Sequence, residues 1–184
     1  MYYFAYGSNM NWRQMQRRCP SARFVCIARL PGYEFAIARH SRLRDCGTAN
    51  IFPKAESTVW GVVYEVSESE MLIMDRFEDG YSRYKRFVYK FGIADSEPQP
   101  EPEASGAPSM LEVIVYIAPK ETSVPLPNAE YKRLMFEGAR HWQLPADYCL
   151  MLAQLKAAEE EKRLTAKSPI VRRFNDERRE EHEV

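Results

Sequence analysis

Three carboxylates and an arginine lie close together in residues 74–80 (M-D-R-F-E-D-G), at the predicted end of a helix. The helical turn before them is apolar, so one of the carboxylates, Asp75, Glu78 or Asp79, could be partly buried. Burial raises the pKa of a carboxyl group above its reference value of about 4.3, which suits the group to general acid–base catalysis near neutral pH. Taken alone, the segment favours the plainer alternative of a solvated helix end.

A second set of candidate groups lies in the loop Tyr6-Gly7-Ser8-Asn9, which connects an aromatic strand to a helix. Gly7 permits a close approach of the backbone to a ligand, and consecutive amides at the start of a helix bind carboxylates or developing oxyanions. The alternative is an ordinary strand-to-helix turn capped by Ser8 or Asn9, and such turns are common. The loop by itself favours that alternative.

The cysteines and histidines show no metal-ligand spacing. The chain has no C-x-x-C pair, and its three histidines are far apart in the sequence. We therefore expect no metal site and four free thiols. A cysteine nucleophile with a histidine base is left open, because such partners meet only in the fold. The cysteines are Cys19, Cys26, Cys46 and Cys149.

Several strands and a few helices must position these groups. Ser67 with Glu70 three residues later forms a capping box at the start of the helix before the acidic segment, and Pro31-Gly32 predicts a turn between two strands. Only two convincing helices lie among the strands, and no G-x-G-x-x-G occurs, so the pattern predicts an α+β fold or small barrel rather than a doubly wound sheet. Strands are predicted at residues 2–6, 22–30, 33–39, 48–52, 59–66, 84–93 and 111–118, helices at 11–18, 67–77, from 128 and at 146–158, and a loop at 95–109.

Composition narrows the class of protein. The chain has 184 residues with 26 basic and 26 acidic side chains, which predicts one domain and argues against a nucleic-acid partner. No apolar run approaches the roughly 20 residues of a membrane span, and the beginning of the chain lacks a signal-peptide pattern. A cytoplasmic location and no membrane partner are therefore expected. Residues 159–184 are dense in charges of both signs and are expected to form a helical or frayed tail.

The order of these features resembles the gamma-glutamylcyclotransferase family. Phe4-Ala5-Tyr6-Gly7-Ser8-Asn9-Met10 resembles the Y-G-S-N signature of that family, and Val59-Trp60-Gly61-Val62-Val63-Tyr64 is similar to its central strand. Residues 74–80 stand where the family has a D-x-x-E turn. Further similarities lie at residues 26–30, 47–51, 131–133 and 138–139, so that the resemblance covers residues 2–156.

The resemblance implies a small mixed β-barrel flanked by helices, in a catalytic domain at residues 1–158. It implies an enzyme of the carbon–nitrogen lyase or acyltransferase type, which cyclises the gamma-glutamyl group of a gamma-glutamyl amino acid to 5-oxoproline and needs no metal or organic cofactor. Glu78 would be the acid and base, the loop Tyr6, Gly7, Ser8 and Asn9 would hold the gamma-glutamyl group, and Tyr131 would be the tyrosine of the family's helix. A homodimer is left open.

One departure and two alternatives accompany this expectation. Asp79 stands between Glu78 and Gly80, where the family often has glycine directly after the glutamate, so Glu78 and Asp79 compete for the role of base. The substrate could also be another gamma-glutamyl amine, an isopeptide or a gamma-glutamyl biosynthetic intermediate. A non-catalytic module that binds a small molecule in the same cavity is the second alternative.

Overall fold

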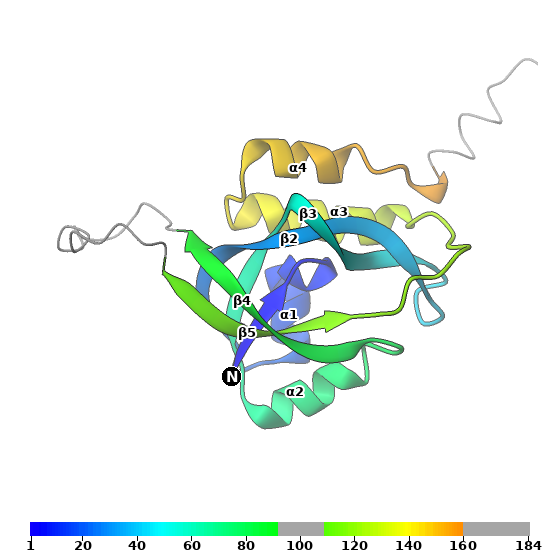
Figure 1. Ribbon diagram of the computed structural model, residues 1–184. Coiled ribbons are helices and arrows are strands. Elements are labelled where there is room, and N and C mark those ends of the chain that lie inside the picture. Colours follow the sequence, from blue (N-terminus) through cyan, green and yellow to red (C-terminus); the bar gives the residue numbers. More distant parts are fainter. Residues whose placement is uncertain (92–108, 160–184) are drawn as a thin grey trace, which may run out of the picture.

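A computed structural model of the chain describes residues 1–91 and 109–159 (Figure 1). Nearly all of the predicted loop at 95–109 and of the predicted tail at 159–184 lies outside these residues. The strands are β1 (Tyr2–Ala5), β2 (Arg23–Ser41), β3 (Cys46–Glu65), β4 (Ser82–Phe91) and β5 (Met110–Ile117). The helices are the short 3₁₀ helix η1 (Ser8–Met10), α1 (Trp12–Arg18), α2 (Glu68–Asp75), α3 (Ala129–His141) and α4 (Ala146–Ala153).

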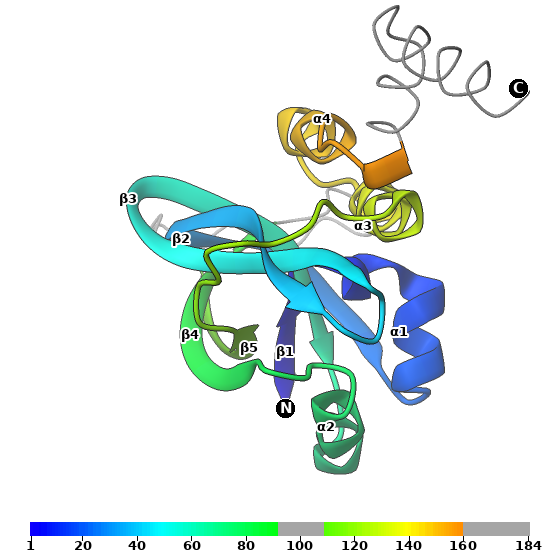
Figure 2. The same cartoon turned by 90° about the vertical axis from the view of Figure 1, so that its right-hand side faces the viewer.

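The five strands form a closed barrel in the order β1-β3-β2-β4-β5. Neighbouring strands are antiparallel except β1 and β5, which pair in parallel at Tyr3 and Ile114 and close the barrel. Figures 1 and 2 show α2 on one side of the barrel and the pair α3 and α4 on the opposite side. The expected α+β class with a small mixed barrel is confirmed. None of the helices within the described ranges is long and apolar enough to cross a membrane.

The turn predicted at Pro31-Gly32 is wrong. Residues 22–39 are not two strands, because β2 is continuous through this dipeptide and pairs along its length with β3, which likewise joins the two strands predicted at 48–52 and 59–66. The pairing passes from Pro31↔Thr58 to Tyr33↔Pro53, which leaves Gly32 on one strand and residues 54–57 on the other outside the ladder. Proline cannot donate a ladder hydrogen bond, and a bulge is where a sheet tolerates it. The signal read as a turn therefore marks a bulge, with Gly32 at φ +74°.

Local capping fixes the helices that lie nearest the acidic segment and the last strand. The predicted capping box is present: the Ser67 side chain accepts a hydrogen bond from the Glu70 amide, and the Glu70 carboxylate accepts one from the Ser67 amide. α2 ends at Asp75, two residues before the predicted end, because the amides of Arg76 and Phe77 bond three residues back and tighten the last turn. Asn128 caps α3 through the Tyr131 amide at 2.7 Å.

Helix α3 holds the loop after β1 against the end of the barrel. A Cβ atom at Gly138 would lie 2.5 Å from the backbone nitrogen of Asn11, so only glycine lets α3 approach η1 this closely. The indole nitrogen of Trp142 donates to the Met10 carbonyl at 2.9 Å, and the Tyr64 hydroxyl donates to the same oxygen at 3.2 Å. The backbone of the loop is therefore fixed by groups from α3 and β3.

Candidate active site

A cavity of about 170 Å³ lies between three connecting segments of the barrel: the loop after β1, the hairpin between β2 and β3, and the turn after α2. All of the residues that the sequence marked as candidate site residues line it. They come from positions up to 125 residues apart, and the fold brings them into one cavity. They are Tyr6, Gly7, Ser8, Asn9, Glu78 and Tyr131.

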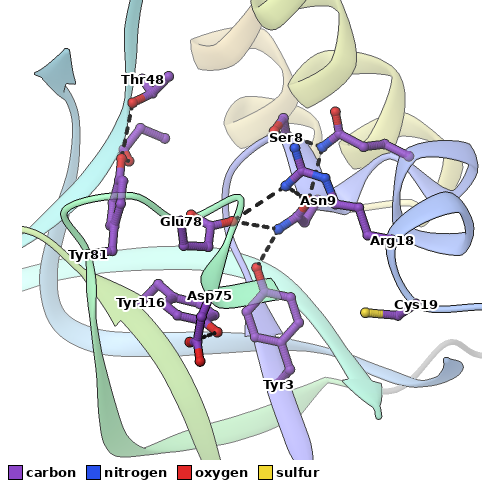
Figure 3. Close-up of polar contacts among 12 residues, drawn as sticks. Tyr3, Ser8, Asn9, Arg18, Cys19, Thr48, Asp75, Glu78, Tyr81 and Tyr116 are labelled. Carbon is purple, nitrogen blue, oxygen red and sulfur yellow. Dashed lines mark hydrogen bonds and ion pairs between the residues drawn. The ribbon is translucent and has the colours of Figure 1, made fainter. Parts of the chain in front are cut away.

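Glu78 is the carboxylate of the acidic turn that enters this cavity. Its side chain is 16% exposed, and its Oε1 atom accepts a hydrogen bond from Asn9 Nδ2 at 3.0 Å (Figure 3). The guanidinium of Arg18, itself 11% exposed, lies 3.6 Å from the same oxygen. A buried carboxylate next to one amide donor and one cation is oriented by both.

The pKa of Glu78 is raised above its ordinary value. Burial, which disfavours the charged form, is the largest cause, and it outweighs the opposing influences of the Arg18 charge and the Asn9 hydrogen bond. A carboxyl group whose pKa is raised towards neutral pH accepts and returns protons more readily than an ordinary glutamate.

The Asn9 side chain has no hydrogen-bonding capacity left over. Its Nδ2 atom donates to Glu78 and, at 2.9 Å, to the Tyr3 hydroxyl, while its Oδ1 atom accepts from Gln14 and from Arg18, both at 3.0 Å. An amide offers two donors and two acceptor positions, and all four are used. Asn9 therefore orients Glu78 and Arg18 through its side chain, and only its backbone is available to a ligand.

Asp75 points away from the cavity and anchors the turn. Its carboxylate accepts two hydrogen bonds from Arg83, at 2.8 and 2.6 Å, and one from the Tyr116 hydroxyl at 2.8 Å. Arg83 also donates to the Met71 carbonyl within α2. Although burial opposes it, hydrogen bonding to Arg83 and Tyr116 holds the pKa of Asp75 below its ordinary value. The two acids of the D-x-x-E pattern thus differ: Asp75 ties α2 to the barrel, and Glu78 faces the cavity.

Asp79, the competitor of Glu78, is an exposed residue at the rim of the cavity. Its backbone carbonyl accepts a hydrogen bond from Arg39 at 3.3 Å. Gly80 follows with φ +79°, and a side chain there would overlap the Arg39 guanidinium, which also pairs with Glu121. The residue inserted before Gly80 is accommodated by this left-handed turn, and the buried carboxylate is Glu78 rather than Asp79.

Tyr131 closes the cavity from α3. Its hydroxyl oxygen accepts a hydrogen bond from the Ala49 amide at 3.0 Å, and a Cβ atom at Gly7 would lie 3.2 Å from that oxygen. Burial raises the pKa of Tyr131 to about 12, so the hydroxyl keeps its proton. The hydroxyls of Tyr3, Ser8 and Tyr131 each accept one hydrogen bond and donate to no acceptor among the described residues.

The amides of Gly7 and Ser8 are also free to donate. Neither meets a backbone or side-chain acceptor within the described part of the chain, and both residues line the cavity. The residues that line the cavity therefore offer both hydrogen-bond donors and the Glu78 carboxylate.

Sequence reasoning missed the residues that support Glu78. Gln14 and Arg18 stand four residues apart in the helix after the loop, so they share one face, and that spacing was the available signal. Tyr81 was not recognised either: its hydroxyl donates to the Ala49 carbonyl at 2.6 Å and lies 3.1 Å from the Thr48 hydroxyl. Tyr81 directly precedes β4 and contacts β3, and no local sequence pattern reports a contact between segments so far apart.

None of the four cysteines lines the cavity. The thiol of Cys19 lies 3.9 Å from the Glu70 carbonyl oxygen, and burial raises its pKa to about 11, which leaves the unreactive thiol form. His40 and His141 also lie outside the cavity lining. Among the residues that the structure describes, no group of three or more histidine, cysteine, aspartate or glutamate side chains is arranged to hold a metal ion.

Comparison of the sequence with known proteins identifies a family for this chain. The model of the family "Gamma-glutamyl cyclotransferase, AIG2-like" matches residues 3–138. The chain is 30% identical to a gamma-glutamylcyclotransferase of Homo sapiens over 161 residues, which cover 85% of this chain and 78% of the relative. The corresponding protein of Mus musculus is 29% identical over the same length and share.

Solved structures have the same fold. A human protein described as uncharacterized superposes with a TM-score of 0.70 at 26% identity and covers 85% of this chain and 88% of its own. A structure named gamma-glutamyl cyclotransferase gives a TM-score of 0.71 at 24% identity, with 91% and 99% of the two chains covered. The chain belongs to the gamma-glutamyl cyclotransferase, AIG2-like family.

Proposed function

We propose that this protein converts gamma-glutamyl amino acids to 5-oxoproline and the free amino acid, with Glu78 as general acid and base. The observation that carries the proposal is the position of Glu78, which is buried, oriented by Asn9 and Arg18, and lines the same cavity as the unpaired amides of the loop after β1. The curated relatives described above bear the name gamma-glutamylcyclotransferase, which supports the same class of reaction.

The substrate supplies its own nucleophile in this reaction. Its α-amine attacks the γ-carbonyl carbon, a new C–N bond closes a five-membered ring, and the C–N bond to the leaving amine breaks. Well-oriented intramolecular reactions reach effective molarities of about 10⁵ M or more, so positioning the amine supplies much of the acceleration. No cysteine or serine nucleophile, metal or organic cofactor is used in this scheme.

Glu78 moves the protons. As a carboxylate it takes a proton from the α-ammonium group, and as a carboxylic acid it gives a proton to the leaving nitrogen. In total the attacking nitrogen loses two protons and the leaving nitrogen gains two, so neither water nor electrons are consumed. A positioned acid–base group of this kind contributes about 10²–10⁴-fold to the rate.

The donors of the loop after β1 fit the charge that develops on the γ-carbonyl oxygen. The amides of Gly7 and Ser8 lack protein acceptors within the described residues and could donate to that oxygen in the tetrahedral intermediate. The protonated hydroxyl of Tyr131 adds a donor for the gamma-glutamyl group.

The location and assembly of the protein follow as further proposals. We expect a cytoplasmic enzyme without nucleic-acid or membrane partners, and size-exclusion chromatography with light scattering decides between a monomer and a homodimer.

The catalytic domain should remain active after removal of residues 160–184. Residue 159 is kept in that variant because the Glu159 carboxylate accepts a hydrogen bond from the Ala129 amide at the start of α3.

The activity is tested by incubating the full chain with a panel of gamma-glutamyl dipeptides, gamma-glutamyl amines and glutathione. The products are then identified by mass spectrometry. We expect 5-oxoproline from the wild-type protein and a loss of about 10²-fold or more in Glu78→Gln. Glu68→Gln, which removes an exposed carboxylate from α2, is the matched control and should keep full activity.

Two results would favour one of the alternatives given in the sequence analysis over this proposal. If 5-oxoproline formed from gamma-glutamyl amines or isopeptides alone, these compounds would be the substrate class instead of gamma-glutamyl amino acids. Binding of gamma-glutamyl compounds without any turnover, equal in wild type and Glu78→Gln, would make the protein a binding module.

A further inference from the structure

The cavity has a buried inner part and an exposed mouth. Its inner wall contains fully or largely buried side chains such as Tyr6, Ala49 and Tyr131, whereas Leu43 and Phe77 at the mouth are 75% and 40% exposed. At about 170 Å³ the cavity is smaller than the roughly 300–1,000 Å³ that enclose drug-sized ligands. It can enclose one small group, and the rest of a larger substrate must extend through the mouth.

The reaction proposed above fixes which part of the substrate extends. The gamma-glutamyl group must lie inside, because its α-amine has to reach Glu78 and its carbonyl oxygen the donors of the loop after β1. The leaving amine is bonded to the far end of that group and so lies towards the mouth. The exposed residues of the mouth therefore meet the substituents of the leaving amine.

The mouth carries an excess of positive charge. Arg42, in the hairpin between β2 and β3, and Arg76, at the end of α2, both line the cavity and are exposed. Neither side chain forms a hydrogen bond or ion pair with another described residue. The acid at the mouth is Asp79, and the whole lining holds four arginines against two carboxylates.

The other two arginines are already engaged by protein groups. Arg18 is hydrogen-bonded to Asn9 and paired with Glu78, and Arg44 donates to Gln14 at 2.6 Å with its guanidinium over the Tyr131 ring. Arg42 and Arg76 are thus the cations of the cavity that remain available to an anion.

We propose that Arg42 and Arg76 bind the carboxylate of the leaving amino acid and are specificity-determining residues, an inference that rests on the proposed cyclotransferase function. A gamma-glutamyl amino acid presents a carboxylate one carbon from the leaving nitrogen, whereas a gamma-glutamyl alkylamine presents none. The protein then discriminates by charge at the mouth, and Arg76 and Arg42 from two separate elements form the receptor for that charge.

Turnover of a matched pair of substrates tests this proposal. Gamma-glutamyl-alanine and gamma-glutamyl-ethylamine differ chiefly by one carboxylate, and kcat and KM are measured for both with wild type, Arg42→Gln, Arg76→Gln and the double variant. Arg13→Gln removes one exposed positive charge of α1 that does not line the cavity and serves as the control.

We expect the wild-type kcat/KM to favour gamma-glutamyl-alanine by about tenfold or more, the scale of one charge-assisted hydrogen bond. The double variant should lose that preference through a higher KM for gamma-glutamyl-alanine, with the ethylamine substrate unaffected. Asp79→Asn should increase the preference, because it removes the opposing charge. High salt should reduce it, because exposed charges are screened.

Equal preference in the wild type and the double variant would overturn the proposal while leaving the cyclotransferase function intact. Calorimetric binding of the same two compounds to Glu78→Gln keeps the test independent of turnover. Equal affinity for both would overturn the proposal even if the proposed reaction failed, and tighter binding of gamma-glutamyl-alanine that is lost on adding Arg42→Gln and Arg76→Gln would support it.

Discussion

Asn9 Nδ2 lies 3.0 Å from Glu78 Oε1, a single hydrogen bond that joins the loop after β1 to the turn after α2 across 69 residues of sequence. Because every hydrogen-bonding position of the Asn9 amide is taken, the position of the carboxylate is tied at once to Tyr3, Gln14 and Arg18. The geometry of the proposed base thus depends on the Asn9 side chain, whose hydrogen-bonding positions are all occupied by protein groups.

Asn9→Ala should reduce kcat by about 10–100-fold, because Glu78, the proposed base, loses its orientation. The same change should move the acidic limb of the kcat profile to higher pH, since the hydrogen bond from Asn9 lowers the pKa of Glu78 and its loss lets burial dominate further. Steady-state kinetics from pH 4 to 9 measure both. An unmoved acidic limb would mean that Asn9 supports the fold alone, and thermal unfolding of the variant provides that comparison.

Activity should fall on the acidic side as Glu78 takes up a proton. The proposed base works as a carboxylate, and the pKa of Glu78 is raised by burial, so kcat/KM should drop with an apparent pKa above the ordinary value of about 4.3. An acidic limb at or below that ordinary value would contradict the burial of Glu78.

The pH dependence of the free energy of unfolding should also reflect the raised pKa of Glu78. A carboxyl group whose pKa is raised in the folded state is favoured as the neutral acid, so its contribution is present at low pH and is lost as pH rises through the folded pKa. The free energy of unfolding of Glu78→Gln, relative to wild type, should therefore increase from about pH 4 upwards. Denaturant titrations at several pH values check this slope, and Glu68→Gln provides the baseline.

Gly7→Ala should raise KM and lower stability slightly. The added Cβ atom would lie 3.2 Å from the Tyr131 hydroxyl and 3.3 Å from the Ala49 Cβ atom, so the tyrosine must shift by a few tenths of an ångström. In a Tyr131→Phe background the same substitution should have a smaller effect, because the crowded oxygen is gone. A double-mutant cycle on KM measures the coupling, and strict additivity would show that the two groups do not press on one another.

Gly138→Ala sets two effects of opposite sign against each other. Alanine favours a helix over glycine by about 1 kcal/mol, whereas overpacking costs about 1–3 kcal/mol. A Cβ atom 2.5 Å from the Asn11 backbone nitrogen meets main chain, which cannot rotate away, so we expect net destabilisation and a displaced loop. Thermal unfolding decides the sign, and a stabilised variant would mean that α3 does not pack on η1 this closely.

Local signals predicted the local structure. The Ser67–Glu70 capping box was predictable because it joins residues three apart, and the D-x-x-E pattern of residues 75–78 identified the acidic turn. The dipeptide Pro31-Gly32 failed for the opposite reason: whether such a pair turns the chain or forms a bulge depends on a partner strand that no local window contains.

The site was predicted as a set of residues rather than as a geometry. The resemblance marked Asn9 and Glu78 together, but the contact between them requires the closed barrel, whose parallel pairing of β1 with β5 joins residues more than 100 positions apart. For the same reason the sequence overlooked Arg18, because its contacts with Asn9 and Glu78 depend on side chains from separate segments.

The hydrogen bond from Trp142 to the Met10 carbonyl has a consequence for synthesis on the ribosome. The two residues are 132 positions apart, so at about 5–20 residues per second the loop emerges roughly 7–26 s before the helix that holds it. Until residues 110–117 have emerged, the aromatic first strand also lacks its β5 neighbour. The cavity lining is therefore complete only once α3, which contributes Tyr131, has emerged, and a ligand of this cavity would find its full site only on chains synthesised past that helix.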